Sequence, residues 1–579
     1  IIGLLSYNII DGAKSKKIRA LDKSIAVLPL DDITLNPSQA LDYEFIGREI
    51  TTCLVKVKDY TIKPWEDCRS YRKRNKKYPE IGNDLSVSLL VEWTPYETEE
   101  NRHLSVDLIS VDEAALLWSE NFEINGTWST EICRLSRKIS KRITRKLRTY
   151  LTPQERALID EQPVAAQASF AASLGSSYTQ DAWKNTVTGN VDRNGEKNEL
   201  IDSISFNSAV KHFTDAINED STFAEAYANR AKAKLWGYKA GFFDRNVLDE
   251  SREDIERAFQ IEQDLPEAHV AMGFYYYYGL REYGLASVSF EKACVMRPNN
   301  NEYQFYLSIV YATLGNWREV QVLINKVFES NPQNAFFFNN LGLSFLYLDD
   351  FPKAILCQDR AIELMPRWYA PYVNKAYFQI WRGEIAEARA TVVQAEENTG
   401  KSFFRFLAEI DLYEDKYASA VKHIELANVQ EFKDMEERKG AACLLKAKIY
   451  KHAGNSQQAR ENYRLAAEYY SDLITQNPGN YRAHSKLGIA YAGLGEKQLA
   501  IESGQKALEL GAQKYSATRF PFILYDMAQI YALTGDHVSS LTTLNKLMDV
   551  NSLYTLDYIK IDPDMKSLLD DPGSQIVNL

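Results

Sequence analysis

The sequence has few cysteines and no long apolar run. Its 579 residues include six cysteines, none of which forms a Cys-x-x-Cys pair. The last three, Cys294, Cys357 and Cys443, take the place of small apolar residues in predicted helices. We therefore expect neither a disulfide framework nor a structural zinc site. Beyond the first ten residues, no stretch approaches the roughly 18 apolar residues of a membrane-spanning helix.

The usual catalytic motifs are also missing. The seven histidines are scattered, and none belongs to a His-Glu-x-x-His motif. A Gly-x-Ser-x-Gly motif is absent, and the glycines form no phosphate-binding loop. Acid pairs such as Asp31–Asp32 and Asp349–Asp350 fall in predicted turns, where aspartate is common for backbone reasons. We expect no catalytic residue, no cofactor and no metal site, hence no enzyme, unless residues distant in sequence meet in the fold.

Charge is distributed unevenly along the chain. Overall, 68 Lys and Arg stand against 79 Asp and Glu, a formal net charge of −11. Residues 1–160 are nearly neutral, so the excess of acid lies in residues 161–579. Acidic surfaces repel phosphate, and we expect no nucleic-acid binding through that region. The length exceeds what one hydrophobic core supports, which predicts two or more domains, or one domain and a repeat array.

What the sequence does contain is a repeat with a period of 34 residues. Pro298, Pro332 and Pro366 are spaced by this interval. Between them, equivalent positions carry these pairs: Leu307 and Leu341, Tyr311 and Phe345, Gly315 and Asp349, Val327 and Ala361. Such a period predicts stacked helical hairpins, because one hairpin cannot bury its apolar face alone.

The side chains within the repeat fit this prediction. Small residues (Gly342, Ala354 and Ala361) stand where two helices must approach closely, and large ones (Phe338 and Phe345 among them) fill the space between layers. The pattern resembles the tetratricopeptide repeat family. Similar positions recur on both sides, so we expect about nine hairpins over residues 206–550, forming a solenoid with an inner groove, and a C-terminal cap at residues 551–579.

The first helix of each hairpin is expected to line this groove. In the central hairpins that face carries Phe305, Ile309, Phe336, Asn339, Leu343, Tyr347, Val373, Tyr377 and Trp381. This mostly apolar surface favours an extended or helical apolar peptide of a partner protein. The alternative is that the aromatic residues pack between layers as core. The sequence also leaves a homo-oligomer open.

Residues 24–150 show a different pattern. Strands are predicted at Lys23–Leu30, Tyr60–Lys63, Leu85–Trp93, Arg102–Val111 and Ala115–Phe122. Helices are predicted at Ala40–Lys58, Trp65–Lys76 and Ser129–Thr149, and turns at Thr94–Asn101 and Asp112–Glu113. This order of elements predicts an α/β domain with a mixed sheet. Residues 151–205 are expected to connect it to the solenoid and to hold the first helix of the array.

Two segments of this domain, SIAVLPL (residues 24–30) and LISVDEAALLWSENF (residues 108–122), resemble the TolB N-terminal-like domain. The tail IDPDMKSLLDDP (residues 561–572) is similar to the end of the architecture in which that domain precedes tetratricopeptide repeats. The resemblance implies a bacterial membrane-linked signalling protein, where a DNA-binding or nucleotide-cyclase domain and one membrane helix commonly come first. After the first strand the chain has LDDI (residues 30–33) instead of the family's Phe, then Asn, Leu or Met and Ser, so no function of that loop is implied.

The helix that closes this domain carries the strongest local charge. Its basic residues, with no acid among them, include Arg134, Arg137, Lys138, Lys141, Arg142, Arg145 and Lys146. An apolar stripe formed by Leu135, Ile139 and Ile143, among others, runs along the same helix. One interpretation is an amphipathic helix on an anionic membrane surface or an acidic partner. The other is a domain helix whose stripe covers the sheet while its charges face water.

The first ten residues, IIGLLSYNII, are apolar but too short to span a bilayer. We expect residues 1–23 to be the end of a membrane helix or signal segment and a linker, with a short ordered arm as the alternative. Because the chain starts without Met, we also expect upstream sequence. Lys14, Lys16 and Lys17 favour the cytoplasmic side of a membrane. The family resemblance implies the periplasm, which we favour, with anchoring in the inner membrane of a bacterial cell envelope.

Taken together, these patterns predict a non-enzymatic interaction arm. An α/β domain stands near a membrane, and a solenoid holds a partner protein or peptide. By resemblance, the chain is the envelope-side part of a membrane-anchored bacterial signalling or regulatory protein. The alternative is a stand-alone adaptor or scaffold subunit of a cell-envelope complex. A winged-helix or cyclase domain upstream of Ile1 would support the first, and a cleaved signal peptide the second.

Overall fold

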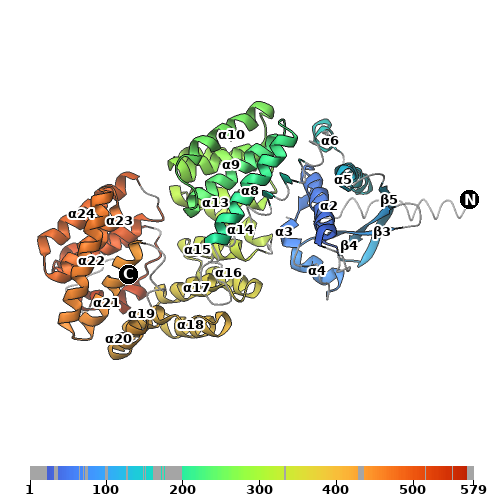
Figure 1. The fold of residues 1–579 in the computed structure, drawn as a ribbon. Helices are drawn as coiled ribbons and strands as arrows, with labels where there is room; N and C mark the ends of the chain where they lie inside the picture. The colour runs from blue at the N-terminus through green and yellow to red at the C-terminus, as the bar shows by residue number, and fades with distance from the viewer. Residues whose placement is uncertain are drawn as a thin grey trace, which may run out of the picture. The chain divides into compact units, whose positions relative to one another are not determined.

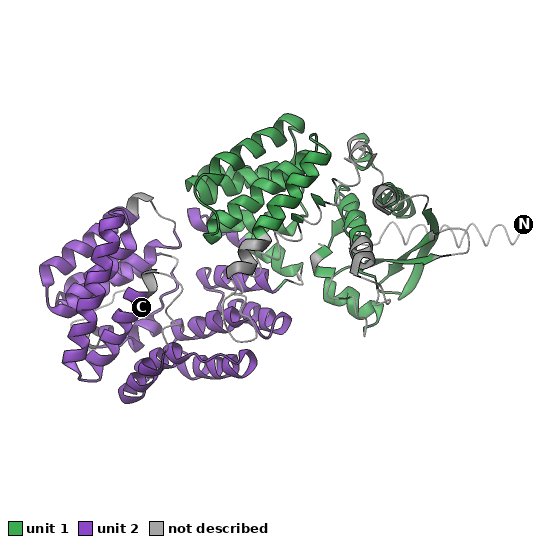
Figure 2. Ribbon diagram, viewed as in Figure 1, with its two compact units in different colours: residues 1–310, 322–334 green, residues 311–321, 335–579 purple. Residues whose placement is uncertain are grey.

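The computed structural model describes residues 23–30, 37–63, 65–68, 71, 76–97, 102–124, 128–147, 149, 151–160, 168, 171–172, 175–176, 199–330, 334–427, 436–514, 517–550 and 552–569. A small mixed sheet with its helices comes first, and a long series of helices follows (Figure 1). The predicted class, an α/β domain followed by an all-α solenoid, is confirmed. The chain divides into two compact units, residues 1–310 with 322–334 and residues 311–321 with 335–579 (Figure 2).

Within the described part of unit 1, one sheet is formed by β1 (Ser24–Val27), β2 (Thr61–Ile62), β3 (Leu89–Glu97), β4 (Arg102–Ser110) and β5 (Ala115–Ile124). Their spatial order is β2-β1-β3-β4-β5. Strand β1 is parallel to both of its neighbours, whereas β3, β4 and β5 are antiparallel. Ile25 and Val27 of β1 face one side and Ala26 the other. All three are fully buried, so both faces of this strand require a cover.

Helices α2 (Pro37–Val55) and α5 (Trp128–Lys146) cover the first face. The apolar stripe of α5, with Leu135, Ile139 and Ile143, is buried in the same core as Ile25 and Val27. The second face packs against α4 (Tyr78–Leu85). The short helices α3 (Trp65–Cys68) and α6 (Pro153–Asp160) belong to the same unit. Of the predicted helix Trp65–Lys76, residues 69–70 and 72–75 lie outside the described residues.

Helix α4 corrects the expectation that a strand begins at Leu85. In the structure Leu85 ends α4, and β3 begins at Leu89. Ser86 adopts a left-handed conformation, with φ of 51°, and its N–H donates to carbonyl groups of the last helical turn. The alternation of apolar residues was misleading, because Leu85 packs onto the sheet from a separate layer. Strand β3 also runs to Glu97, through part of the predicted turn, since Glu97 pairs with Arg102.

The helical array fills the rest of the described chain. In unit 1 it comprises α8 (Glu199–Glu219) and the hairpins α9 (Ala224–Ala240) with α10 (Val247–Ile261) and α11 (Pro266–Phe274) with α12 (Tyr283–Met296). A π-helical turn, η2 (Tyr275–Leu280), extends α11. Helices α13 (Asn301–Leu314) and α14 (Trp317–Glu329) each contribute to both units.

The array continues in unit 2 with six hairpins within the described residues. They are α15 (Ala335–Tyr347) with α16 (Phe351–Leu364), α17 (Tyr369–Trp381) with α18 (Ile385–Thr399), α19 (Phe404–Tyr413) with α20 (Tyr417–Leu426), α21 (Glu436–His452) with α22 (Ser456–Gln476), α23 (Tyr481–Leu494) with α24 (Lys497–Lys514), and α25 (Phe520–Leu533) with α26 (His537–Met548). In each pair the two helices pack against each other. In each hairpin, and in the consecutive helices α13 and α14, the helix that comes earlier in the sequence is called the first helix below, and the other is called the second helix.

The hairpin of α15 and α16 explains the recurring small residues. Ala354 and Ala361 are fully buried, and so is the large side chain of Phe345. A Cβ atom added to Gly342 would lie 3.0 Å from the carbonyl oxygen of Ala354 and would overlap the amide group of Gln358. The roles predicted for these residues are confirmed. Pro332, which helped to define the repeat, lies outside the described residues.

After α26 the chain forms two short helices, α27 (Leu556–Ile561) and α28 (Pro563–Leu569). We call residues 552–569 the C-terminal segment. Helix α27 packs against α17, and α28 packs against α25. Both partners are first helices, and they belong to hairpins far apart in sequence. Residues 1–22, which were expected to end a membrane helix or signal segment, lie outside the described residues. So do residues 570–579 of the predicted cap.

Candidate functional site

The residues predicted to line the groove belong to three first helices. Phe305 and Ile309 lie on α13 in unit 1, where Phe305 is buried and Ile309 half-buried. The other predicted groove residues lie in unit 2, on α15 and α17. Because the two units are described separately, whether all nine residues share one surface stays a prediction.

On α15 the predicted residues differ in exposure. Tyr347 is buried, and its hydroxyl donates to the carbonyl oxygen of Thr518 at 2.7 Å, while its ring stacks on Trp317. Asn339 is also buried. Phe336 is half-buried, and Leu343 is 38% exposed. Leu343 is therefore the position of this set that offers the most surface to a ligand.

On α17 the predicted residues pack beside the chain's own C-terminal segment. Val373, Tyr377 and Trp381 are half-buried and lie against a hydrophobic cluster. From the C-terminal segment, this cluster contains the buried residues Tyr558, Ile559, Met565 and Leu568. It also includes residues of α18, α19, α25 and α26. A polypeptide segment thus already lies against first helices of this unit.

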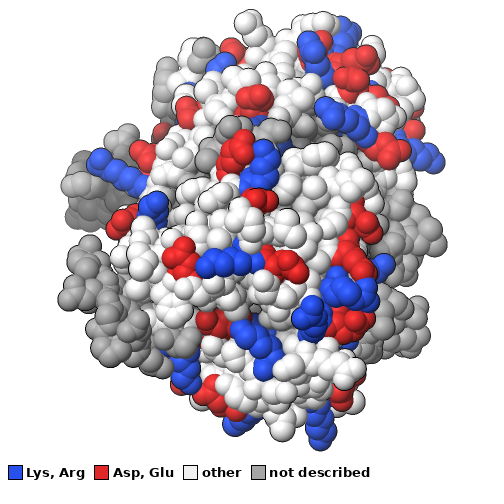
Figure 3. All heavy atoms as spheres, turned by 90° about the vertical axis from the view of Figure 1, so that its left-hand side faces the viewer, with Lys and Arg blue, Asp and Glu red and all other residues white. Residues whose placement is uncertain are grey.

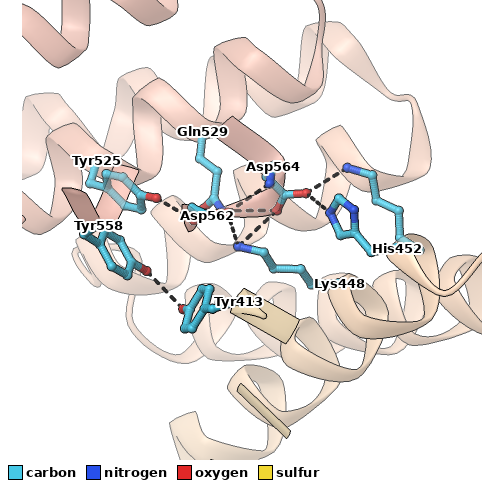
Figure 4. Close-up of polar contacts among 9 residues, drawn as sticks. Tyr413, Lys448, His452, Tyr525, Gln529, Tyr558, Asp562 and Asp564 are labelled. Carbon is cyan, nitrogen blue, oxygen red and sulfur yellow. Dashed lines mark hydrogen bonds and ion pairs between the residues drawn. The ribbon is translucent and has the colours of Figure 1, made fainter. Parts of the chain in front are cut away.

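Two carboxylates of the C-terminal segment are held by side chains of α21 and α25 (Figure 4). Asp562 lies 2.6 Å from the Nζ atom of Lys448 and accepts a hydrogen bond from the Tyr525 hydroxyl. Asp564 lies 2.9 Å from Nζ of Lys451 and 2.8 Å from Nε2 of His452. It also accepts a hydrogen bond from the Gln529 amide at 3.2 Å, and Lys448 lies 3.4 Å away, between the two acids.

Local sequence explains how these groups meet. Lys448, Lys451 and His452 are spaced three and four residues apart in the last turns of α21, so they share one helical face. Tyr525 and Gln529 are four residues apart on α25 and also share a face. Within the C-terminal segment, the Asp562 carboxylate accepts a hydrogen bond from the Asp564 N–H at 2.9 Å, which fixes the turn around the intervening proline.

Both carboxylates are buried, and cationic side chains surround them. Burial alone would raise the pKa of Asp564, but Lys448, His452 and Lys451 outweigh it and hold this pKa well below its usual range. Burial would lower the pKa of Lys448, yet Asp562 and Asp564 raise it above its ordinary value. No residue drawn in Figure 4 has a buried polar atom without a partner. The cluster is thus a complete set of ionic and hydrogen-bonding contacts.

Further contacts extend from this polar cluster along the C-terminal segment. The hydroxyl groups of Tyr558 and Tyr413, on α27 and α19, lie 3.2 Å apart. Thr555 donates to the carbonyl oxygen of Trp381 at the end of α17. Lys566 forms an ion pair at 2.7 Å with Asp415, just after α19. The segment therefore bridges first helices from α17 to α25.

The basic residues of α5 are divided by their position on the helix. Arg134, Lys138, Arg145 and Lys146 are exposed, whereas Arg137, Lys141 and Arg142 are half-buried. Arg142 lies 3.1 Å from Glu120 of β5, and Lys138 lies over the ring of Phe122. Because the apolar stripe packs on the sheet, only the charged side of this helix is available to a partner. Among the helices of the described residues, none is long and apolar enough to cross a membrane.

The described residues offer little for chemistry beyond binding. They contain no group of three His, Cys, Asp or Glu side chains placed to hold a metal ion. Burial raises the pKa of the Cys53 and Cys294 thiols to about 12, which disfavours the reactive thiolate. On the face drawn in Figure 3, acidic and basic residues are interspersed and neither sign forms a large patch. What the polar cluster can do is hold carboxylates.

Sequence reasoning did not identify this cluster. Lys448 and Lys451 look like ordinary solvated residues of a repeat helix, and His452 was one of several scattered histidines. The available signal was the pair of acids, Asp562 and Asp564, on either side of a proline. Their partners could not be read from the sequence, because 112 to 114 residues separate them from the tail.

This chain is similar in sequence or structure to several known proteins. Residues 453–515 match the family model described as tetratricopeptide repeat. DnaJ homolog subfamily C member 7 of Mus musculus is 24% identical over 379 residues, which are 62% of this chain and 69% of that protein. Its Homo sapiens counterpart is 25% identical over 53% of this chain and 57% of its own length.

Among solved structures, a tetratricopeptide repeat protein from Parabacteroides merdae is 14% identical, with a TM-score of 0.31. The alignment covers 46% of this chain and 99% of that protein. The family model and the hairpin architecture agree with each other. Residues 453–515 are therefore tetratricopeptide repeats, and the other described hairpins of the array form a solenoid of similar kind, an architecture associated with protein interaction and generally not with catalysis.

Proposed function

We propose that this chain is a non-enzymatic scaffold that binds a partner protein or peptide along the first helices of its tetratricopeptide hairpins. One observation carries the proposal. The C-terminal segment, an irregular polypeptide with two short helices, lies across α17, α19, α21 and α25. First helices of this array therefore provide a surface on which a peptide is bound, with both apolar and polar contacts.

One part of this surface that stays accessible is on α15, where Leu343 is 38% exposed. The test is affinity capture with the intact chain, followed by mass spectrometry, in cells that naturally produce it. Wild type is compared with Leu343→Asp, which places a charge on the proposed surface. We expect the variant to lose at least one protein that wild type retains, because an unpaired charge in an apolar contact opposes binding.

Leu356→Asp provides a matched control. Leu356 is also an exposed leucine of this hairpin, at 53%, but lies on the second helix, α16. We expect this variant to retain the same proteins as wild type. Each retained protein is then purified and its affinity for the three chains measured directly. If Leu343→Asp and Leu356→Asp behave alike toward every such protein, binding along the first helices is wrong.

We further propose that the scaffold works beside the membrane, in the periplasm, as part of a bacterial signalling or regulatory protein. Support comes from the apolar residues 1–10, from the exposed basic side chains of α5, and from the resemblance of residues 24–150 to the TolB N-terminal-like domain. A stand-alone adaptor of a cell-envelope complex is the alternative. Determining the sequence upstream of Ile1 distinguishes them, because a DNA-binding or cyclase domain is expected only in the signalling protein.

A further inference from the structure

We propose that the last turns of α21 and the facing part of α25 form a binding site for an acidic segment of a partner protein, with two carboxylates two residues apart. The C-terminal segment occupies this site until the partner segment replaces it. The site consists of Lys448, Lys451, His452, Tyr525 and Gln529. The inference rests on the proposed function, because it specifies the ligand of one part of the same first-helix surface.

Charge is the first argument for this ligand. Two lysines and a histidine converge within two turns of one helix, in a part of the chain that is acidic overall. Such a local concentration of positive charge selects acidic segments and disfavours neutral or basic ones. The natural occupant shows the chemistry that fits, since each of its carboxylates contacts a lysine at hydrogen-bonding distance.

Geometry narrows the ligand to a pair of carboxylates. Asp562 and Asp564 have separate sets of donors, and only Lys448 contacts both. A ligand with one carboxylate would leave buried donors of the other set without a partner, which is costly. A segment in which two acids flank a single residue satisfies both sets at once.

The C-terminal segment has the properties of a replaceable ligand. Helices α27 and α28 contain six and seven residues, too short to be stable alone, so their structure depends on docking. The hairpin of α21 and α22 has its own seam, where Ala447, Ala459 and Ala466 are buried. The site can therefore stay formed while the segment leaves.

The test measures binding of a fluorescent peptide of residues 552–569 to the full chain by anisotropy. In wild type the attached segment competes at a high effective concentration. The double variant Asp562→Asn with Asp564→Asn weakens that competitor. We expect it to bind the peptide about tenfold or more tightly than wild type does. Asp557→Asn, which removes an exposed acid of the same segment, is expected to behave like wild type.

Two further peptides test the chemistry of recognition. In one, both acids are replaced by Asn, and we expect about tenfold or more weaker binding to the double variant. In the other, the two acids and the proline are kept with the residues of the segment that contact the solenoid, and all other positions become Ser. The kept contact residues are Tyr554, Thr555, Tyr558, Ile559, Ile561, Met565, Lys566 and Leu568. We expect this peptide to bind like the natural sequence, because it keeps these contacts.

Three results would overturn the inference: equal affinity for the acidic and Asn peptides, a folded double variant that binds no peptide, or a double variant whose site is filled by a second copy, seen as a dimer by light scattering.

If the double variant fails to fold, a wild-type chain with a protease site inserted after Val550 is used in its place. After cleavage, the labelled peptide should exchange for residues 552–569, and a fragment that never exchanges contradicts the proposal. None of these outcomes affects capture through Leu343, so the two proposals fail independently.

Discussion

The Nζ atom of Lys448 lies 2.6 Å from a carboxylate oxygen of Asp562, although 114 residues separate them in sequence. This contact joins α21 to the C-terminal segment and places a half-buried lysine between two buried acids. Removal of one partner from an ion pair of this kind strongly destabilises the folded structure, because the other charge stays buried without compensation. Lys448 is therefore the residue on which attachment of the segment depends most.

Replacement of Lys448 by Met should release the C-terminal segment. We expect a loss of about 3–5 kcal/mol in docking of residues 552–569, because both carboxylates lose their shared cation. Hydrogen–deuterium exchange of that segment measures the effect as faster exchange. Lys439→Met, at an exposed position on the same helix, is the control and should leave exchange unchanged. Equal exchange in the two variants would show that Lys448 does not hold the segment.

Attachment of the segment should weaken in acid. The pKa of Asp564 is lower in the folded chain than its ordinary value of 3.8, so its contribution is complete above that value. The contribution is lost as the pH falls through the folded-state pKa. Lys448, whose pKa is raised, stays charged throughout this range. We expect exchange protection of residues 552–569 to fall as the pH drops below about pH 4.

The Asp564→Asn variant tests this assignment. It should lose most of the acid dependence, whereas Asp557→Asn should keep it, because Asp557 is exposed and lies outside the cluster. Protection must be corrected for the intrinsic pH dependence of exchange. Protection that stays unchanged below about pH 4 in wild type would contradict the role of Asp564.

Replacement of Gly342 by Ala should destabilise unit 2. The added Cβ would lie 3.0 Å from the Ala354 carbonyl oxygen and would overlap Gln358. Overpacking of this kind costs about 1–3 kcal/mol. Gly284→Ala is the control, since a Cβ there meets nothing within 4 Å and alanine favours a helix. We expect the melting temperature to fall for Gly342→Ala and to stay equal or rise for Gly284→Ala.

The exposed basic side of α5 should bind anionic vesicles if the chain works beside a membrane. Each basic residue near an anionic surface contributes about 1 kcal/mol. Replacing Arg134, Lys138, Arg145 and Lys146 by Glu should therefore reduce sedimentation with phosphatidylglycerol vesicles by about a hundredfold or more. The control replaces four exposed basic residues of the array by Glu: Lys439, Arg460, Lys497 and Lys506. Equal losses in both variants would mean that vesicle binding depends on the net charge of the chain and not on the basic residues of α5.

The repeats could be predicted because their stability is local. Gly342 and Ala354 meet across one hairpin only twelve residues apart, and Gly488 and Ala500 repeat this contact at the same separation in a later hairpin. The mixed sheet was predictable for a similar reason, since the alternating residues of β4 and β5 reveal their two faces. Leu85, the last residue of α4, was assigned to a strand because it continues an apolar alternation that belongs to the next strand.

The candidate site could not be predicted in the same way. Tyr377 and Trp381 have the helical spacing of groove residues, but the sequence does not show that Tyr558 and Ile559 lie in the cluster against which they pack. That contact links segments about 180 residues apart, and no periodicity encodes it. Only the three-dimensional fold brings such residues together, which is why the sequence did not show that Lys448 is a partner of Asp562 and Asp564.

A photo-crosslinking amino acid placed at position 343 tests the central claim most directly. The intact chain is irradiated with the protein retained in affinity capture, and position 356 on α16 serves as the reference. If first helices bind the partner, the crosslink forms from position 343 and is absent from position 356. A crosslink from position 356 with none from position 343 would place the partner on the second helices of the hairpins and contradict the account.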